Sequence, residues 1–303
     1  VSLQDLSIDA PKEFHDLKTV KSQSVDLGID VFSLFSDQIQ FTELIVNEGD
    51  FNVVTDSLGN FSFAIFKTSD EPSSTDSSFK LALNKIKVKN THVLYQDDAS
   101  KIKIETNNTN ISGDVQVTDK FINFETETDI HSLFFGLDKS VLVDRKPLKG
   151  TVNTKVNLNP VSVEFNENKL LLANLPLRIL GKVAVLDKGI DFDLNVKSEN
   201  ASLENLFSLV PADYQKWYEG MTFTGKSNID LLLKGVMQDS ISNPSLNIKL
   251  GIVNGTVAAK QFEKVPVKNL NTTTELNMPQ LNPDSLHINV ADFAFNLGDG
   301  FAK

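Results

Sequence analysis

Residues 189–198 read GIDFDLNVKS, and this short stretch contains the pattern that decides the fold. Apolar side chains at the even-numbered positions from Ile190 to Val196 alternate with Asp and Asn at the odd-numbered positions. Successive side chains of a β-strand point to opposite faces, so an alternating segment has one apolar and one polar face. We therefore predict a β-strand here with one face in water and one face away from it.

The same alternation recurs along the chain. It is found in SDQIQFTELIV (36–46), KIKVKNTHVLY (85–95), GTVNTKVNLNP (150–160), SLNIKLGIVNG (245–255) and SLHINVADFAF (285–295). At one strand and turn per roughly 15–20 residues, the chain would hold about fifteen to twenty strands. Short helices are expected only near 30–35, at 131–136 and within 203–218, where Ser202 is a suitable N-cap. The sequence thus predicts a mainly β, antiparallel, meander-like protein.

Composition excludes several classes of function. The 303 residues contain no cysteine, so disulfides, thiolate metal sites and thiol nucleophiles are excluded. The net charge of −11 argues against nucleic acid and against a polybasic membrane patch. The 21 Phe outnumber the 3 Tyr and 1 Trp, which favours aromatic side chains placed away from water.

The low-complexity stretch TSDEPSSTDSS marks the boundary between two predicted parts of the chain. Its Ser, Asp and Pro residues cannot bury enough apolar surface to become ordered, so 68–78 is predicted to be a mobile loop. It would separate an N-terminal segment, 1–67, from a main β region, 79–303. No run is long and apolar enough for a membrane-spanning helix, and the alternation persists to the last residues. We expect the β region to continue beyond the chain end.

One literal motif suggests nucleotide binding. Gly220 to Ser227, GMTFTGKS, matches the P-loop expression G-x-x-x-x-G-K-[ST]. A true P-loop follows a buried strand and begins a helix. Here the preceding residues are helix-like and the following SNIDLLLKG is strand-like, so we favour two turn glycines with a strand between them. Nucleotide binding is kept as a remote alternative.

Other polar residues have simpler explanations. Asp191 and Asp193 would share a solvated strand face, and Asp97 with Asp98 would form a turn. The chain has no nucleophile elbow or metal-binding motif, and its four histidines are scattered. We predict no catalytic residue, no metal and no cofactor. Asn-x-Ser/Thr sequons occur by chance in a chain so rich in Asn and Thr. They are found at Asn60, Asn107, Asn110, Asn200, Asn254 and Asn271.

Several segments together resemble the bacterial AsmA family. They are VSLQDLSID (1–9), the stretch 20–63 with Gly59-Asn60-Phe61, KIKVKNTHVLYQDD (85–98), LENLFSLVPADY (203–214), FTGKSNIDLLLKG (223–235) and 243–277. The last pairs Asn243-Pro244 with Asn254-Gly255, Pro266-Val267 and Asn269-Leu270. The resemblance covers nearly the whole chain and depends on diffuse patterns. The N-terminal membrane helix usual in the family is not found in these residues.

The resemblance implies a fold and a setting. AsmA-like proteins resemble the bridge-like lipid transfer proteins, whose long, curled antiparallel sheet forms an open-barrel-like groove with an apolar concave face. The family is associated with the inner membrane, the periplasm, outer-membrane biogenesis and phospholipid movement. We accordingly expect a non-enzymatic periplasmic protein, tethered to the inner membrane by a segment outside this chain. Its expected partners are phospholipid, or another acyl-chain lipid, and membrane proteins of the envelope.

One-sided strands with so few helices must bury their apolar face by curling, by pairing with a second sheet or by holding lipid. Composition does not choose among the three, and the resemblance favours a lipid groove. The groove candidates are Val152, Val156, Leu158, Ile190, Phe192, Leu194, Val196, Ile248 and Leu250. The alternative is a closed β-sandwich that acts as a scaffold or interaction module without lipid.

Overall fold

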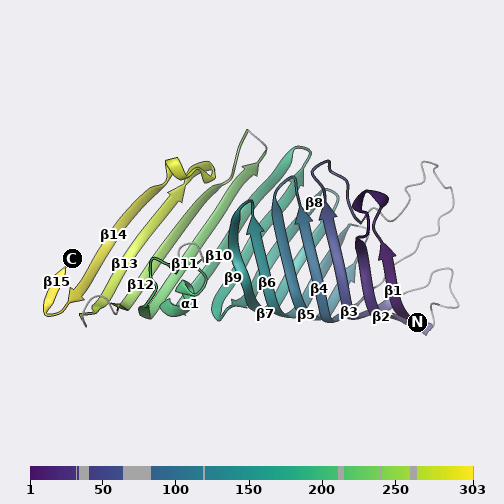
Figure 1. Ribbon diagram of the computed structural model, residues 1–303, viewed down its shortest axis with the longest axis horizontal. Coiled ribbons are helices and arrows are strands. Elements are labelled where there is room, and N and C mark those ends of the chain that lie inside the picture. The colour runs from purple at the N-terminus through teal and green to yellow at the C-terminus, as the bar shows by residue number, and fades with distance from the viewer. Residues whose placement is uncertain are drawn as a thin grey trace. The chain divides into compact units, whose positions relative to one another are not determined.

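The structure, a computed structural model, describes residues 1–31, 33, 41–63, 83–118, 120–210, 215–238, 241–259 and 265–302. It is 76% β-strand, and the strands form one sheet of fifteen in chain order, with β1 and β15 at the two ends (Figure 1). The sheet is not closed on itself in the described part of the chain. The predicted mainly β fold with few helices is confirmed.

The chain divides into two compact units, Val1–Thr151 and Val152–Lys303. Seven strands begin in the first unit: β1 (Ser2–Asp9), β2 (Lys18–Ile29), β3 (Phe41–Thr55), β4 (Lys85–Asp97), β5 (Ile102–Val117), β6 (Phe121–Leu137) and β7 (Ser140–Leu158). Eight belong to the second unit: β8 (Val161–Leu172), β9 (Leu175–Leu186), β10 (Gly189–Ser202), β11 (Met221–Met237), β12 (Ser245–Ala259), β13 (Val267–Met278), β14 (His287–Leu297) and β15 (Gly300–Ala302). Helical segments are short: α1 (Leu203–Phe207), η1 (Lys12–Phe14), η4 (Pro279–Leu281) and η5 (Pro283–Ser285).

The helix predictions had mixed outcomes. α1 forms where expected, and the Ser202 side chain accepts a hydrogen bond from the backbone N–H of Asn205. The turn predicted at 131–136 is wrong, because these residues belong to β6. The predicted loop 68–78 and half of the helix predicted at 30–35 lie outside the described residues. In the part of the chain that is described, no helix is long and apolar enough to span a membrane.

One strand pair departs from the predicted antiparallel meander. β3 and β4 pair in parallel, whereas the pairs from β4 to β6 and from β8 to β15 are antiparallel. Parallel neighbours need a crossover connection of a dozen or more residues. The long connection between Thr55 and Lys85 provides it.

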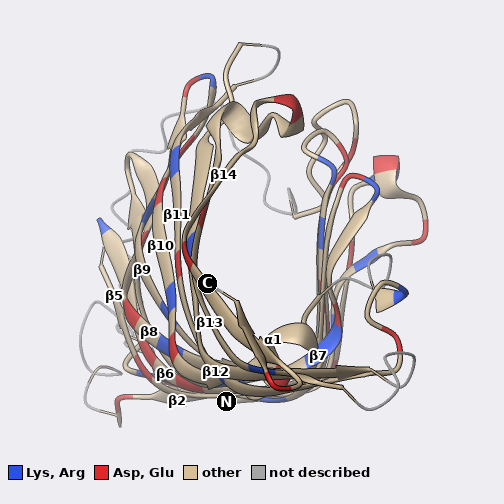
Figure 2. Ribbon diagram, turned by 90° about the vertical axis from the view of Figure 1, so that its left-hand side faces the viewer, with Lys and Arg blue, Asp and Glu red and all other residues tan. Residues whose placement is uncertain are grey.

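Bulges allow the strands to bend without changing which face is apolar. Between β4 and β5, the register advances three residues on β4, from Val88 to Thr91, but only two on β5, from Ile111 to Thr109. β4 thus has one residue more than β5 in this stretch, and Asn90 within it has a left-handed backbone conformation, with φ of 48°. A bulge bends its strand and shifts the following side chains by one position. Val88 and Thr91, on the two sides of the bulge, therefore lie on the same face of the sheet. Figure 2 shows the strands curving along their length.

Asparagine is the residue most often found at these bends. Left-handed backbone is costly for most side chains but tolerated by Asn. Left-handed asparagines at register shifts are Asn90, Asn108, Asn200, Asn254 and Asn269. In three cases the bulge N–H donates to an Asn Oδ1 on the neighbouring strand: Asn90 to Asn110 (3.2 Å), Asn200 to Asn228 (2.8 Å) and Asn254 to Asn271 (3.1 Å). Four of the sequon asparagines thus take part in these bulge contacts.

Buried hydroxyl groups satisfy other backbone groups of the strands. Thr91, 1% exposed, accepts from the Gly49 N–H at 3.3 Å and donates to the Lys89 carbonyl at 3.1 Å. Ser22 donates to the Asn47 carbonyl at 2.8 Å. Buried backbone groups without a partner are costly, so these two small hydroxyl residues stabilise the strands around them.

A charged cluster crosses β3, β4 and β5 on the polar face of the first unit. His92 Nδ1 lies 2.8 Å from Asp50 Oδ1, and His92 Nε2 lies 3.4 Å from Glu105 Oε1. Lys103 Nζ lies 3.0 Å from Glu105 Oε2. The hydrogen bond from Lys103, assisted by His92, lowers the pKa of Glu105 against the opposing effect of its partial burial.

The bulge amides give a first prediction. Asn228→Ala removes the acceptor for the Asn200 N–H and should lower the free energy of unfolding by about 1 kcal/mol. Asn228→Asp keeps an acceptor oxygen at the same place and should unfold close to the wild type. Urea unfolding of the three proteins measures the effect. Equal losses in both variants would show that the hydrogen bond is not what stabilises the bulge.

The Glu105 cluster gives a second prediction. Because the folded pKa is lowered, Glu105 contributes stability above its usual pKa of 4.5, and this is lost as the pH falls through the folded pKa. Glu105→Gln should cost less than about 1 kcal/mol at pH 7, since the site is partly exposed. It should also reduce the loss of thermal stability between pH 4.5 and 3. Lys103→Gln should have the same effect on the pH profile, and an unchanged profile in either variant would contradict this assignment.

Candidate functional site

The predicted groove residues on β10 and β12 lie on one face of the second unit. On β10 the four candidates from Ile190 to Val196 alternate with polar neighbours and so share a face. Val196 pairs with Leu231 on β11, and Leu231 pairs with Ile248 on β12. Directly paired residues share a face. Leu250, two residues after Ile248, lies on that face as well.

The candidates on β7 lie on this face too. The side chain of Asn157 contacts Ser162 Oγ at 3.0 Å and Glu164 Oε1 at 2.9 Å, which places Asn157 on the polar face. Val156 and Leu158 flank Asn157 and therefore point the other way. The Thr154 hydroxyl lies 3.0 Å from Asn168 Nδ2, on the apolar side of β8. The apolar face of the second unit thus contains all nine candidates.

Sequence reasoning missed much of this face. Three rows of mostly aliphatic side chains cross it: Phe165, Gly181, Leu194, Leu233, Leu246 and Met278; Ile179, Val196, Leu231, Ile248, Leu276 and Ile288; Ser198, Ile229, Leu250, Thr274 and Val290. The run Leu231 to Leu233 obscured the alternation on β11. Leu232 pairs with Asn195 and points to the polar face.

The apolar face is only partly covered. Eight of the nine candidates are half-buried and Leu158 is 40% exposed. None of the nine candidates is among the fully buried apolar side chains of the described residues, which are Val20, Val46, Leu83, Val115, Ile130, Leu175, Ala201 and Leu203. A closed sandwich would bury both inner faces, whereas the described strands form one sheet. The face is a contiguous apolar surface of the kind that marks an interaction site.

The opposite face of the second unit is charged. Glu164, Lys182, Asp193 and Lys234 are paired in turn across β8 to β11, with alternating sign. Lys182 Nζ lies 3.4 Å from Glu164 Oε1, and Lys234 Nζ lies 3.0 Å from Asp193 Oδ2. The prediction that Asp191 and Asp193 share a solvated face is confirmed.

The P-loop-like segment is a strand. β11 begins at Met221, so Lys226 and Ser227 point to opposite faces of the sheet. Ser227 is fully buried, and the Lys226 ammonium donates to the Asn200 carbonyl at 3.4 Å. A phosphate-binding loop needs consecutive N–H groups that converge on the ligand. The nucleotide alternative is therefore wrong.

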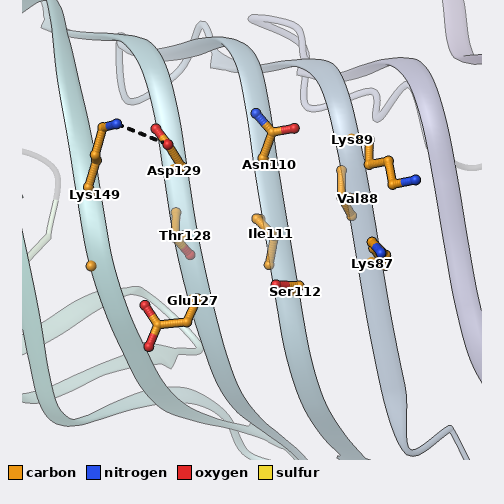
Figure 3. Close-up of a pocket in the computed structure, with 11 residues that line it drawn as sticks. Lys87, Val88, Lys89, Asn110, Ile111, Ser112, Glu127, Thr128, Asp129 and Lys149 are labelled. Carbon is orange, nitrogen blue, oxygen red and sulfur yellow. Dashed lines mark hydrogen bonds and ion pairs between the residues drawn. The ribbon is translucent and has the colours of Figure 1, made fainter.

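The charged pocket in the first unit offers no convergent chemistry. Figure 3 shows this pocket, about 620 Å³ in volume, with Lys87, Glu127 and Lys149 among the residues that line it. The Lys149 ammonium lies 3.0 Å from Asp129 Oδ2 and is already paired. Within the described ranges, no three His, Asp or Glu side chains are grouped to hold a metal ion. The Asp97 carboxylate accepts from the Ala99 N–H at 2.9 Å, so the predicted turn is confirmed.

The comparisons with known proteins agree with this architecture. Comparison with curated proteins and with solved structures found no match. The sequence profile of the AsmA family matches residues 1–294, which is nearly the entire chain. The chain therefore belongs to the AsmA family, a family of bacterial envelope proteins.

Proposed function

We propose that the apolar face of the second unit binds the acyl chains of phospholipids, and that the protein carries lipid in the bacterial periplasm without catalysing a reaction. Outer-membrane biogenesis is the process that this activity would serve, with envelope membrane proteins as partners. Membership of the AsmA family supports the envelope setting. The half-exposed apolar face of the second unit supports the proposed binding of acyl chains.

The size and composition of this face suit acyl chains. Its rows of Leu, Ile, Val and Met side chains cross β9 to β14, and most of these side chains are half-buried. Each methylene removed from water contributes about 0.8 kcal/mol, so a chain of about fifteen methylenes contributes on the order of 10 kcal/mol before the entropic cost of binding. That free energy is sufficient without any polar contact.

The distribution of charge leaves the head group in water. On β8 to β11 the charged side chains belong to the opposite face, where Glu164, Lys182, Asp193 and Lys234 pair with one another. The three rows of the apolar face contain no Asp, Glu, Lys or Arg. Burying an unpaired charge among them would be costly. The proposed ligand thus contacts the protein through its hydrocarbon part.

Two neighbouring leucines provide a matched test. Leu231 lies on the apolar face and Leu232 on the polar face of the same strand. Leu231→Asp places a carboxylate in the path of the acyl chain and should abolish phospholipid co-purification. Leu232→Asp makes the same chemical change on the solvated face and should leave bound lipid unchanged. Lipid extraction and native mass spectrometry of protein purified without detergent measure the difference.

Circular dichroism and thermal unfolding control for folding of both variants. Phe192→Asp, on the apolar face of β10, provides an independent repeat of the loss. A lipid-free wild type, or equal lipid in the Leu231 and Leu232 variants, would refute lipid binding on this face.

A further inference from the structure

Protein already covers one part of the apolar face. α1 contacts β10 and β11 and lies near one end of these strands (Figure 1). The ring of Phe207, in α1, stacks on Phe223 of β11 with centroids 3.8 Å apart and planes inclined by 10°. β11 alternates regularly from Phe223 to Leu231, so both side chains belong to the apolar face. The helix therefore lies on the same face as the proposed lipid site.

This cover is held in place at several points. The Tyr218 hydroxyl donates to the Phe207 carbonyl at 3.1 Å, and the Tyr218 ring meets Phe207 and Phe223 edge-on at 5.4 and 5.8 Å. Leu203 is 1% exposed, and the Asn205 amide donates to the Asn174 carbonyl at 3.1 Å. Edge-on contacts between aromatic rings are favourable beyond the area that they bury. We call α1 together with Tyr218 the aromatic cover.

The bulges separate the covered part of the face from the open part. On β12 the register shift between Val253 and Thr256 divides Ile248, paired with Leu231, from Val257, paired with Phe223. The cover lies on the Val257 side. On the Ile248 side, Val196, Leu231 and Ile248 are half-buried. The helical segment η4 contacts β12, and its Gln280 N–H donates at 3.3 Å to the hydroxyl of Ser245, the first residue of that strand.

We infer that the aromatic cover confines lipid to the Ile248 side of the bulges, so that an acyl chain lies across the strands there and does not extend to Val257. The inference depends on the proposed function, since it specifies where on the same face the lipid lies. The Phe207 and Tyr218 rings lie against Phe223, the residue paired with Val257, so an acyl chain can lie on the Phe223 ring only if these rings move away.

Site-specific photocross-linking tests the position of the lipid. A benzophenone side chain is introduced at Ile248 or at Val257, two positions on the same strand and the same face. After irradiation of the full chain with its co-purified lipid, mass spectrometry detects lipid adducts. We expect lipid adducts at position 248 and no adducts at position 257. Adding Phe207→Ala and Tyr218→Ala removes the rings of the cover and should produce adducts at 257 while leaving those at 248 unchanged.

The outcomes separate this inference from the proposed function. Adducts at neither position, in any background, would overturn lipid binding on this face. Adducts at both positions with the cover intact would overturn the inference and leave lipid binding supported. A position 257 that stays unlabelled after removal of both rings would also overturn the inference, because the cover would then not be what excludes lipid. Circular dichroism establishes that each variant is folded.

Discussion

The main constraint on this protein is that each strand must bend while its apolar side chains stay on one face. A strand alternates strictly, so a bend that displaced the pattern by one residue would turn half of its apolar side chains into water. The bulges prevent this by adding one residue at the bend. Val88 and Thr91, three positions apart, consequently share a face, as do Ser198 and Ala201. The continuous apolar face of the second unit depends on this correction being repeated from strand to strand.

The repeated bulge also explains why asparagine is frequent in the strands of this protein. Asparagine tolerates the left-handed backbone of the bulge, and a second asparagine on the next strand accepts the released N–H, as Asn110 does for Asn90 and Asn228 for Asn200. The hydroxyl groups of Ser22 and Thr91, both almost completely buried, are hydrogen-bonded to strand backbone, and Thr91 lies next to the bulge of β4. These polar residues stabilise the fold.

Much of the fold could be predicted from alternation, and the exceptions have physical causes. The face of Ile190 to Val196 follows directly from period two, because β10 is regular over that stretch. In KIKVKNTHVLY, strict alternation would place Val93 opposite to Val88, and nothing in a single sequence identifies Asn90 as the extra residue. The apolar run Leu133 to Phe135 has no period and so is compatible with either a helix or a strand. The aromatic cover was missed for a different reason, since the stacking of Phe207 on Phe223 is a tertiary contact between residues that no local pattern connects.

The order of the strands has a consequence for how the sequence of such a protein can gain or lose strands in evolution. Because the strands follow one another in chain order, a strand is joined chiefly to the one before it and the one after it, and α1 packs mainly on β10 and β11, its neighbours in sequence. In arrays of this kind the total stability is close to a sum of local terms and nearest-neighbour terms. Duplication or loss of a pair of strands, with their bulges, would leave the contacts of distant strands intact. The number of strands in the sheet can then change in evolution while the contacts within each remaining strand pair are kept.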